Sequence, residues 1–113
     1  MRQLVKTFKA LSDPNRLRIL KMLEVRPLCV CEITSVLNLA TSTVSKHLSI
    51  LRDAGFIVDQ KQGKWVNYRL NDQASDYVAD LLPLIKKWLP ADETVLKDRQ
   101  KLEAVDRFTI CQT

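Results

Sequence analysis

Hydrophobic residues recur three or four positions apart through most of the 113-residue chain, which is the spacing of helices that bury one face. Leu4, Phe8 and Leu11 predict a first short helix. A leucine-rich second helix follows Asp13 and Pro14. Asp13 can accept hydrogen bonds from free N–H groups at the helix start, and Pro14 suits the first helical position. Only two glycines interrupt the chain, so the pattern predicts a mainly helical protein.

Two further helices are expected in the middle of the chain, joined by a tight connection. The first is short and covers about Cys31–Leu37. The second covers about Ser42–Ala54, with Thr41 as its N-terminal cap and Gly55 as its left-handed stop. One side of this second helix is apolar and the other side polar; the apolar residues are Val44, Leu48 and Leu51, and the polar ones are Ser42, Ser45, Lys46, Ser49 and Arg52. A short helix, a tight turn and a polar-faced helix predict a helix-turn-helix.

The pattern changes after Gly55 to one that predicts a β-hairpin. Phe56–Val58 and Trp65–Leu70 have the character of strands, and the polar turn between them carries two lysines. A last long helix, capped by Asn71 or Asp72, has a hydrophobic stripe from residue 74 to 88 that Pro83 kinks or splits. The predicted fold is mainly α with a β-hairpin wing (α+β). It is a winged helix-turn-helix in the order helix, helix, helix, helix, strand, strand, helix.

The charge of the chain is unevenly distributed. The chain is long enough for one ordinary domain, which we place at residues 1–90, followed by a charged C-terminal segment at residues 91–113. Residues 1–70 carry 12 Lys and Arg against five Asp and Glu, whereas residues 71–113 carry six against eight. A basic body of this kind favours a polyanion such as nucleic acid as partner.

No membrane or secretory signal is visible in the sequence. No apolar run approaches the roughly 20 residues that span a bilayer, and the N-terminus lacks the apolar core of a signal peptide. We therefore expect a cytoplasmic protein with no membrane partner.

The polar face of the helix at 42–54 fits a surface that reads DNA. Hydroxyl residues are weak helix formers, so their concentration here favours a role in close approach to the major groove. The N-terminus of the helix also attracts phosphate. The alternative is an ordinary amphipathic surface helix. The candidate DNA-binding residues are Thr41, Ser42, Ser45, Lys46 and Ser49 in the helix, and Lys61 and Lys64 at the hairpin tip.

Cys29 and Cys31 are two thiols separated by one residue, and such a pair can bind one soft ion. Side chains at positions i and i+2 do not share a face of an ideal helix. Both thiols therefore reach one ion only if Cys29 lies before the helix or the first turn distorts. Distortion there would move the DNA-reading helix that this helix supports, which makes the pair a possible switch. We also expect the helix N-terminus to lower the thiol pKa.

A third ligand can come from Cys111 or from a small external thiol. With three cysteines and one histidine, the chain is a poor candidate for a four-coordinate structural zinc site. The alternative interpretation is that Cys29 and Cys31 are small buried hydrophobic residues.

Three stretches of the chain together resemble the arsenic sensors of the ArsR/SmtB family of bacterial winged-helix regulators over about residues 3–88. These stretches are the cysteine box PLCVCEI, the segment LATSTVSKHLSILRDAGFIV and the second-helix opening LSDPNRLRIL. The resemblance implies a homodimer formed through the first and last long helices. It also implies binding to double-stranded operator DNA, with release when As(III) or Sb(III) binds.

By position, Cys29 and Cys31 match the inducer thiolates of the family, and the family's DNA-contacting positions match Thr41, Ser42, Ser45 and Lys46. Many of these sensors carry a third cysteine where this chain has Thr34. The alternatives are then a two-coordinate site or the recruitment of Cys111. The zinc-type site on the last helix requires histidines, and none occurs there.

Other functions compete with metalloid sensing. The same thiols can form a disulfide in a redox-sensing repressor, or bind cadmium, lead or copper(I) in a soft-metal sensor of the same fold. A thiol oxidoreductase is disfavoured. No glycine-rich phosphate loop, nucleophile elbow or paired-carboxylate spacing occurs in the chain. We therefore expect a repressor of a metalloid-resistance operon, not an enzyme.

Overall fold

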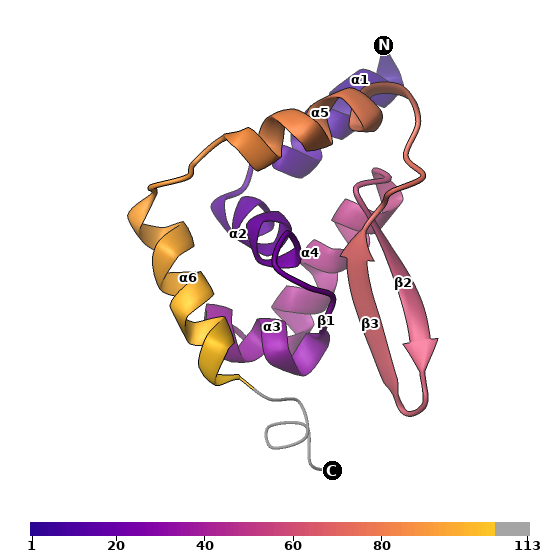
Figure 1. The fold of residues 1–113 in the computed structure, drawn as a ribbon. Helices are drawn as coiled ribbons and strands as arrows, with labels where there is room; N and C mark the ends of the chain where they lie inside the picture. The colour runs from indigo at the N-terminus through magenta and orange to yellow at the C-terminus, as the bar shows by residue number, and fades with distance from the viewer. Residues whose placement is uncertain (106–113) are drawn as a thin grey trace.

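The computed structural model describes residues 1–105, which form six helices and one three-stranded antiparallel sheet (Figure 1). The helices are α1 (Arg2–Leu11), α2 (Pro14–Leu23), α3 (Val30–Leu37), α4 (Thr41–Asp53), α5 (Asp76–Lys87) and α6 (Glu93–Ala104). The strands are β1 (Leu28–Cys29), β2 (Ile57–Gln62) and β3 (Trp65–Leu70). The winged helix-turn-helix predicted from the sequence is confirmed. No helix within the described range is long and apolar enough to cross a membrane.

The starts of α2 and α4 illustrate one correct and one wrong prediction. Asp13 caps α2 as predicted, because its Oδ1 accepts hydrogen bonds from the N–H groups of Asn15 at 2.8 Å and Arg16 at 3.3 Å. The prediction that Thr41 caps α4 is wrong, since Ala40 occupies the cap position and Thr41 is the first helical residue. Ala40 has the extended backbone of a cap residue, with φ −62° and ψ 143°, so the helix begins at Thr41, one residue earlier than predicted.

The sheet contains one strand that the sequence pattern did not reveal. Its order is β1-β3-β2, and β1 pairs antiparallel with β3 so that Cys29 lies opposite Asn67. The first strand of the hairpin is also longer than predicted, because β2 extends through its polar residues and stays paired with β3 as far as Gln62 opposite Trp65. Gly63 closes the hairpin with a φ of +60°, which favours glycine.

The long helix α5 runs unbroken through Pro83, so the alternative of a split helix is wrong. The expected cap at Asn71 or Asp72 is wrong as well, since α5 begins after Ser75. Asn71 instead donates from Nδ2 to the carbonyl oxygen of Gly55 at 3.0 Å, which holds the end of β3 against the end of α4. A residue engaged in that tertiary contact does not cap the helix.

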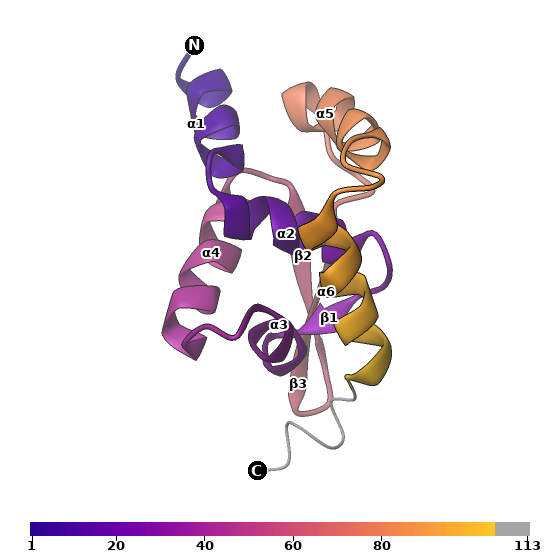
Figure 2. The ribbon, with the colours of Figure 1, turned by 90° about the vertical axis from the view of Figure 1, so that its left-hand side faces the viewer.

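One apolar core connects all of these elements. The buried side chains of α2, α3 and α4 form one cluster with side chains of the three strands. Helix α6 packs on α2 and α3 (Figure 2). Lys21 is also buried, and its Nζ donates to the carbonyl oxygens of Ile85 at 2.9 Å and Trp88 at 2.7 Å. These bonds tie the C-terminal end of α5 to α2.

Helix α6 lies in the segment that we placed after residue 90, and it packs on α2 and α3.

Candidate functional site

The helix-turn-helix consists of α3 and α4, which pack on each other across a tight turn. Asn38 makes this turn in the left-handed conformation, with a φ of 55°. On α4, three residues point into the core with exposures of at most 1%: Val44, Leu48 and Leu51. The five predicted DNA-binding residues of the helix are all exposed: Thr41, Ser42, Ser45, Lys46 and Ser49. The structure thus presents them together as one polar surface.

A contact between α2 and α4 holds this surface in place. Nη1 of Arg16 lies 3.2 Å from Nδ1 of His47, the only histidine of the chain. The same guanidinium donates to the carbonyl oxygens of Ala10 at 2.8 Å and Lys9 at 3.1 Å in the last turn of α1. Arginine keeps its protons at all ordinary pH values, so Nδ1 of His47 acts as the acceptor. Arg16 therefore joins the end of α1 to the reading helix.

The wing places its two predicted contact residues in solvent. Lys61 lies in β2 and Lys64 in the turn, and both are exposed. Nζ of Lys64 lies 4.9 Å from the centre of the Trp65 ring, a cation–π distance. At the base of the wing, Arg52 of α4 forms an ion pair with Asp59 of β2 at 3.3 Å. This contact orients the wing relative to α4.

The two cysteines of the box lie on opposite sides of a helix start. Cys29 ends β1 and occupies the N-cap of α3 in an extended conformation, with φ −90° and ψ 167°. It is 2% exposed, whereas Cys31 lies in the first turn and is exposed. Cys29 thus precedes the helix, which is one of the two arrangements required for both thiols to approach one ion, but its side chain is buried while that of Cys31 is exposed.

Glu32 completes a capping box with Cys29. The sulfur of Cys29 accepts from the backbone N–H of Glu32, and Oε1 of Glu32 accepts from the N–H of Cys29 at 3.0 Å. The other oxygen, Oε2, pairs with Nη1 of Arg26 at 2.7 Å. Arg26 also donates to the carbonyl oxygens of Leu102 and Val105, both at 3.4 Å. This network joins the cysteine box to the end of α6.

The pKa of the Cys29 thiol is raised, so the expectation that the helix start lowers it is wrong for this residue. Burial is the largest cause, and the negative charge of Glu32 adds to it. The N–H groups of Glu32 and Cys31 act in the opposite direction but do not outweigh the loss of solvent. Cys29 is therefore held as a protonated thiol at neutral pH.

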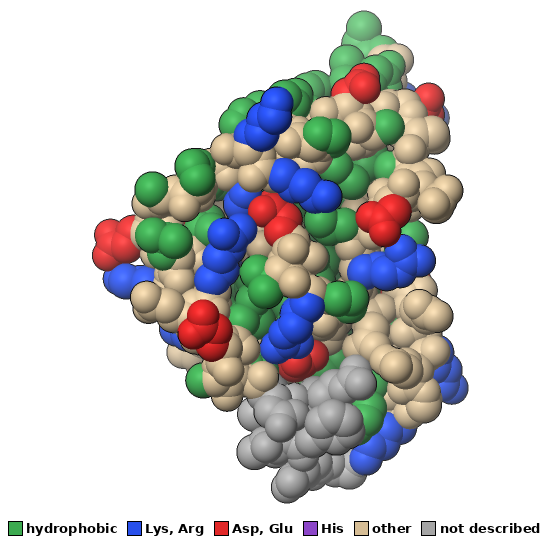
Figure 3. Space-filling view, viewed as in Figure 1, with side chains coloured by type: hydrophobic (Ala, Val, Ile, Leu, Met, Phe, Trp, Pro, Cys, Tyr) green, Lys and Arg blue, Asp and Glu red, His purple; other side chains and the backbone are tan. Residues whose placement is uncertain are grey.

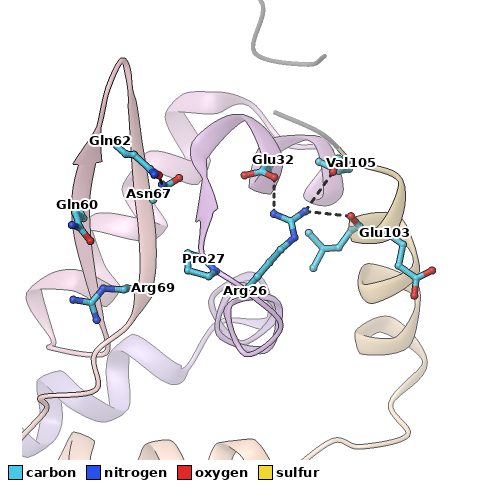
Figure 4. A pocket seen from close by; sticks show the side chains of 10 residues that line it. Arg26, Pro27, Glu32, Gln60, Gln62, Asn67, Arg69, Glu103 and Val105 are labelled. Atoms are coloured by element: carbon cyan, nitrogen blue, oxygen red, sulfur yellow. Dashed lines mark hydrogen bonds and ion pairs between the residues drawn. The ribbon is translucent and has the colours of Figure 1, made fainter. Parts of the chain in front are cut away.

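A cavity of about 810 Å³ opens beside this network, between the wing, the α2–β1 link and the end of α6 (Figure 4). Arg26 and Glu32 form part of its lining, and Arg69 faces it from β3. Sequence reasoning had singled out neither Arg26 nor Glu32. A cysteine followed three positions later by a glutamate at a helix start is a capping-box pattern, and it was the available signal for Glu32.

The third predicted thiol, Cys111, lies outside the described residues. Within residues 1–105, no group of three or more His, Cys, Asp or Glu side chains is placed to hold a metal ion. Cys29 and Cys31 are the two cysteines within residues 1–105, and one residue separates them.

The fold and the exposed surfaces of α4 and the wing define a winged helix-turn-helix DNA-binding protein. Residues 13–58 match the model of a family described as bacterial regulatory protein, arsR family. The chain is 35% identical over 104 residues to the "Arsenical resistance operon repressor" of Escherichia coli (strain K12), which covers 91% of this chain and 81% of that protein. The chain therefore belongs to the arsR family of transcriptional repressors, whose members are DNA-binding regulators and not enzymes.

Two further comparisons extend this assignment. The chain is 41% identical over 69 residues to the "Cadmium resistance transcriptional regulatory protein CadC homolog" of Staphylococcus aureus, covering 60% of this chain and 57% of that one. A solved structure titled as the homodimeric winged helix-turn-helix DNA-binding domain of Mb0332 from Mycobacterium bovis matches with a TM-score of 0.65 at 28% identity. The match covers 76% of this chain and 77% of that one.

Proposed function

We propose that this chain is a homodimeric repressor of a metalloid-resistance operon that leaves its operator when As(III) or Sb(III) binds Cys29 and Cys31. The observation that carries the proposal is the position of Cys29 as the N-cap of α3, directly before the helix that supports the reading helix α4. Thiolates are soft ligands that favour thiophilic ions.

Binding of an ion at this pair competes with the start of α3. The sulfur of Cys29 accepts the N–H of Glu32, and an ion on that sulfur displaces this bond. Cys29 is held from the other side by its pairing with Asn67 in β3, so the movement falls on the first turn of α3. Because α3 packs on α4, the free energy of ion binding can shift α4 away from its DNA-bound position.

The position of Val105 supports Cys111 of the same chain as a third ligand. Val105 accepts from Arg26, and Arg26 pairs with Glu32 at the start of α3. Cys111 lies six positions after Val105, and six steps of extended chain reach at most about 20 Å. That length suffices to bring Cys111 to the pair, and an external thiol is the alternative donor.

On DNA, we place the exposed face of α4 in the major groove and the wing on the phosphate backbone. The α4 contacts are Thr41, Ser42, Ser45, Lys46 and Ser49, and the wing contacts are Lys61 and Lys64. Two half-sites would be separated by one helical turn or a multiple of it. The wing lysines supply affinity and salt dependence more than sequence discrimination.

A surface for the second subunit is available on α1 and α5. Both helices expose large apolar side chains: Val5 and Phe8 on α1, and Tyr77 and Leu84 on α5, with Trp88 just after it. Hydrophobic side chains gather along the edge of the molecule where α1 and α5 lie (Figure 3). Exposed apolar surface of this kind marks a protein–protein interface.

The test is a fluorescence anisotropy titration with a palindromic operator from upstream of the protein's own gene, with As(III) added under reducing conditions. We expect As(III) to release the wild type but not Cys29→Ser/Cys31→Ser, while both bind DNA equally well without it. Ser45→Ala/Lys46→Ala should lose operator binding at all concentrations of As(III). Cys111→Ser separates two from three protein ligands, because only a three-ligand site loses its response. Wild-type binding that As(III) leaves intact would refute the proposed inducer.

A soft-metal sensor is the second candidate, and the likeness to the cadmium resistance regulator favours it. Cadmium and lead also prefer thiolate ligands. In the same titration, release by Cd(II) or Pb(II) at lower concentration than by As(III) would favour this candidate. Release by peroxide that a reductant reverses, without any metal response, would indicate redox sensing.

A further inference from the structure

Helix α1 carries a row of cations that no described residue neutralises. Arg2, Lys6 and Lys9 are spaced i, i+4 and i+7, so they share one face of the helix. All three are exposed, and none forms an ion pair with another residue of the described part of the chain. The inward side of α1 is formed by other residues, among them Thr7 and Ala10. The row is therefore free to meet an anion.

The cationic row lies alongside the reading helix. Arg2, Lys6 and Lys9 line a groove of about 600 Å³ whose other wall includes Ile50 and Asp53 of α4. Asp53 is the one acidic residue among the described residues that line this groove. In Figure 2, α1 and α4 lie on one side of the molecule, and α5 and α6 lie on the other. The groove thus adjoins the helix-turn-helix, not the opposite face.

The DNA-reading surface continues into this groove. Lys46, Ile50 and Asp53 are spaced i, i+4 and i+7 on α4, so one edge of α4 carries all three. Lys46 belongs to the proposed reading surface, and Ile50 and Asp53 line the groove with α1. A duplex held against Lys46 would therefore pass close to the cations of α1.

We propose that Arg2, Lys6 and Lys9 form a third DNA contact beside the reading helix and the wing, and that they bind backbone phosphates. The inference rests on the proposed DNA-binding mode of α4. Four residues of helix span about 6 Å, so the row offers one cation per turn along the backbone. Phosphate contacts fix the orientation of a protein on DNA without reading its sequence. The row would therefore add affinity on any duplex and hold α4 in register.

The test compares two triple variants of the full chain. Arg2→Gln/Lys6→Gln/Lys9→Gln removes the row, and Lys86→Gln/Lys87→Gln/Lys97→Gln removes three exposed cations from the end of α5 and from α6 on the opposite side. Affinity for the operator and for an unrelated duplex of equal length is measured by anisotropy between about 50 and 200 mM salt. Size-exclusion chromatography and thermal unfolding verify that each variant keeps its assembly and fold.

We expect the α1 variant to bind both duplexes at least tenfold more weakly than the control variant at about 150 mM salt. Its plot of log affinity against log salt should be shallower by about 0.9 for each phosphate that the variant no longer binds. Equal affinity and slope in the two variants would overturn the inference. Weaker binding with an unchanged slope would overturn it too, because a disturbed fold or assembly gives that result.

The failure of this inference is distinct from the failure of the proposed function. If the wild type binds the operator and Ser45→Ala/Lys46→Ala does not, the reading role of α4 stands whatever the α1 variant does. If the wild type binds no better to the operator than to unrelated DNA, the proposed function fails, and the salt slope of the α1 variant on unrelated DNA still decides the role of the row.

Discussion

Arg18 on α2 holds Asp98 on α6 through two hydrogen bonds of 2.9 Å, from Nε to Oδ2 and from Nη2 to Oδ1. The Asp98 side chain is 3% exposed, and its pairing with Arg18 draws α6 onto α2. The positive charge of the guanidinium is stabilised by this pairing, which raises the pKa of Arg18.

Removing one partner of this pair should destabilise the protein strongly. Asp98→Ala leaves Arg18 without its carboxylate in a half-buried site, and we expect a loss of about 3–5 kcal/mol in the free energy of unfolding. Urea unfolding measures the change. Lys97→Ala is the matched control, since Lys97 is 65% exposed and its pair with Glu93 lies in solvent. The control should change stability by no more than about 0.5 kcal/mol. Equal effects of the two variants would contradict this role of Asp98.

The contact between Arg16 and His47 predicts a difference between two substitutions of the histidine. His47→Leu removes the acceptor that faces Nη1 of Arg16, whereas His47→Gln can present an amide oxygen in its place. We expect the leucine variant to lose about 1–3 kcal/mol of stability and to bind the operator more weakly. The glutamine variant should retain most of both properties. Thermal unfolding and operator titration at pH 7 provide the measurement, and a leucine variant that equals the glutamine variant would show that the contact does not position α4.

The cap of α2 predicts a pH dependence of stability. Burial is the largest single cause and acts to raise the pKa of Asp13, but the N–H groups of Asn15 and Arg16 and the charges of His47 and Arg16 together hold this pKa below its ordinary value. The carboxylate therefore stabilises the fold above the unfolded-state pKa of about 3.9, and this contribution is lost as the pH falls through the lower folded-state value. At pH 7, Asp13→Ala should lose about 0.5–2 kcal/mol.

Urea unfolding between about pH 3 and 7 tests the sign of this effect. The difference in stability between the wild type and Asp13→Ala should shrink as the pH falls below about 4. Asp13→Ser retains a capping oxygen without a carboxylate, so it should be less destabilised than the alanine variant. The difference in stability between the serine and alanine variants should not change over this pH range. A difference that grows toward low pH would contradict the assignment.

The raised pKa of Cys29 predicts slow alkylation at neutral pH. In a Cys31→Ser/Cys111→Ser background, Cys29 is the only thiol, and its reaction with iodoacetamide should rise only above the ordinary thiol pKa of about 8.5. Glu32→Gln removes a negative charge that raises this pKa, so the profile should move to lower pH. Glu93→Gln at the exposed start of α6 is the control, and it should leave the profile in place. A shift to higher pH in Glu32→Gln would refute the electrostatic argument.

The sequence pattern was sufficient for elements whose signals are local. The apolar spacing of Val44, Leu48 and Leu51 and the cap at Asp13 are short-range features, and the structure confirms the helices that they predict. The strand at Leu28–Cys29 was missed because two residues are too few for an alternating pattern, and this strand exists only through its pairing with β3. The paired length of β2 was missed for the same reason, since exposed polar residues stay in a strand only when a partner strand satisfies their backbone.

For the site, the sequence by itself determined which residues are chemically able to act: two thiols separated by one residue, and a helix with hydroxyl and basic side chains on one face. Residue type and spacing decide these properties. Only the tertiary structure decided that Cys29 is buried with a raised pKa and that Glu32 joins it through Arg26 to the end of α6. It alone also placed the cations of α1 beside α4. Burial and the approach of charges depend on segments far apart in the chain, and no local pattern records them.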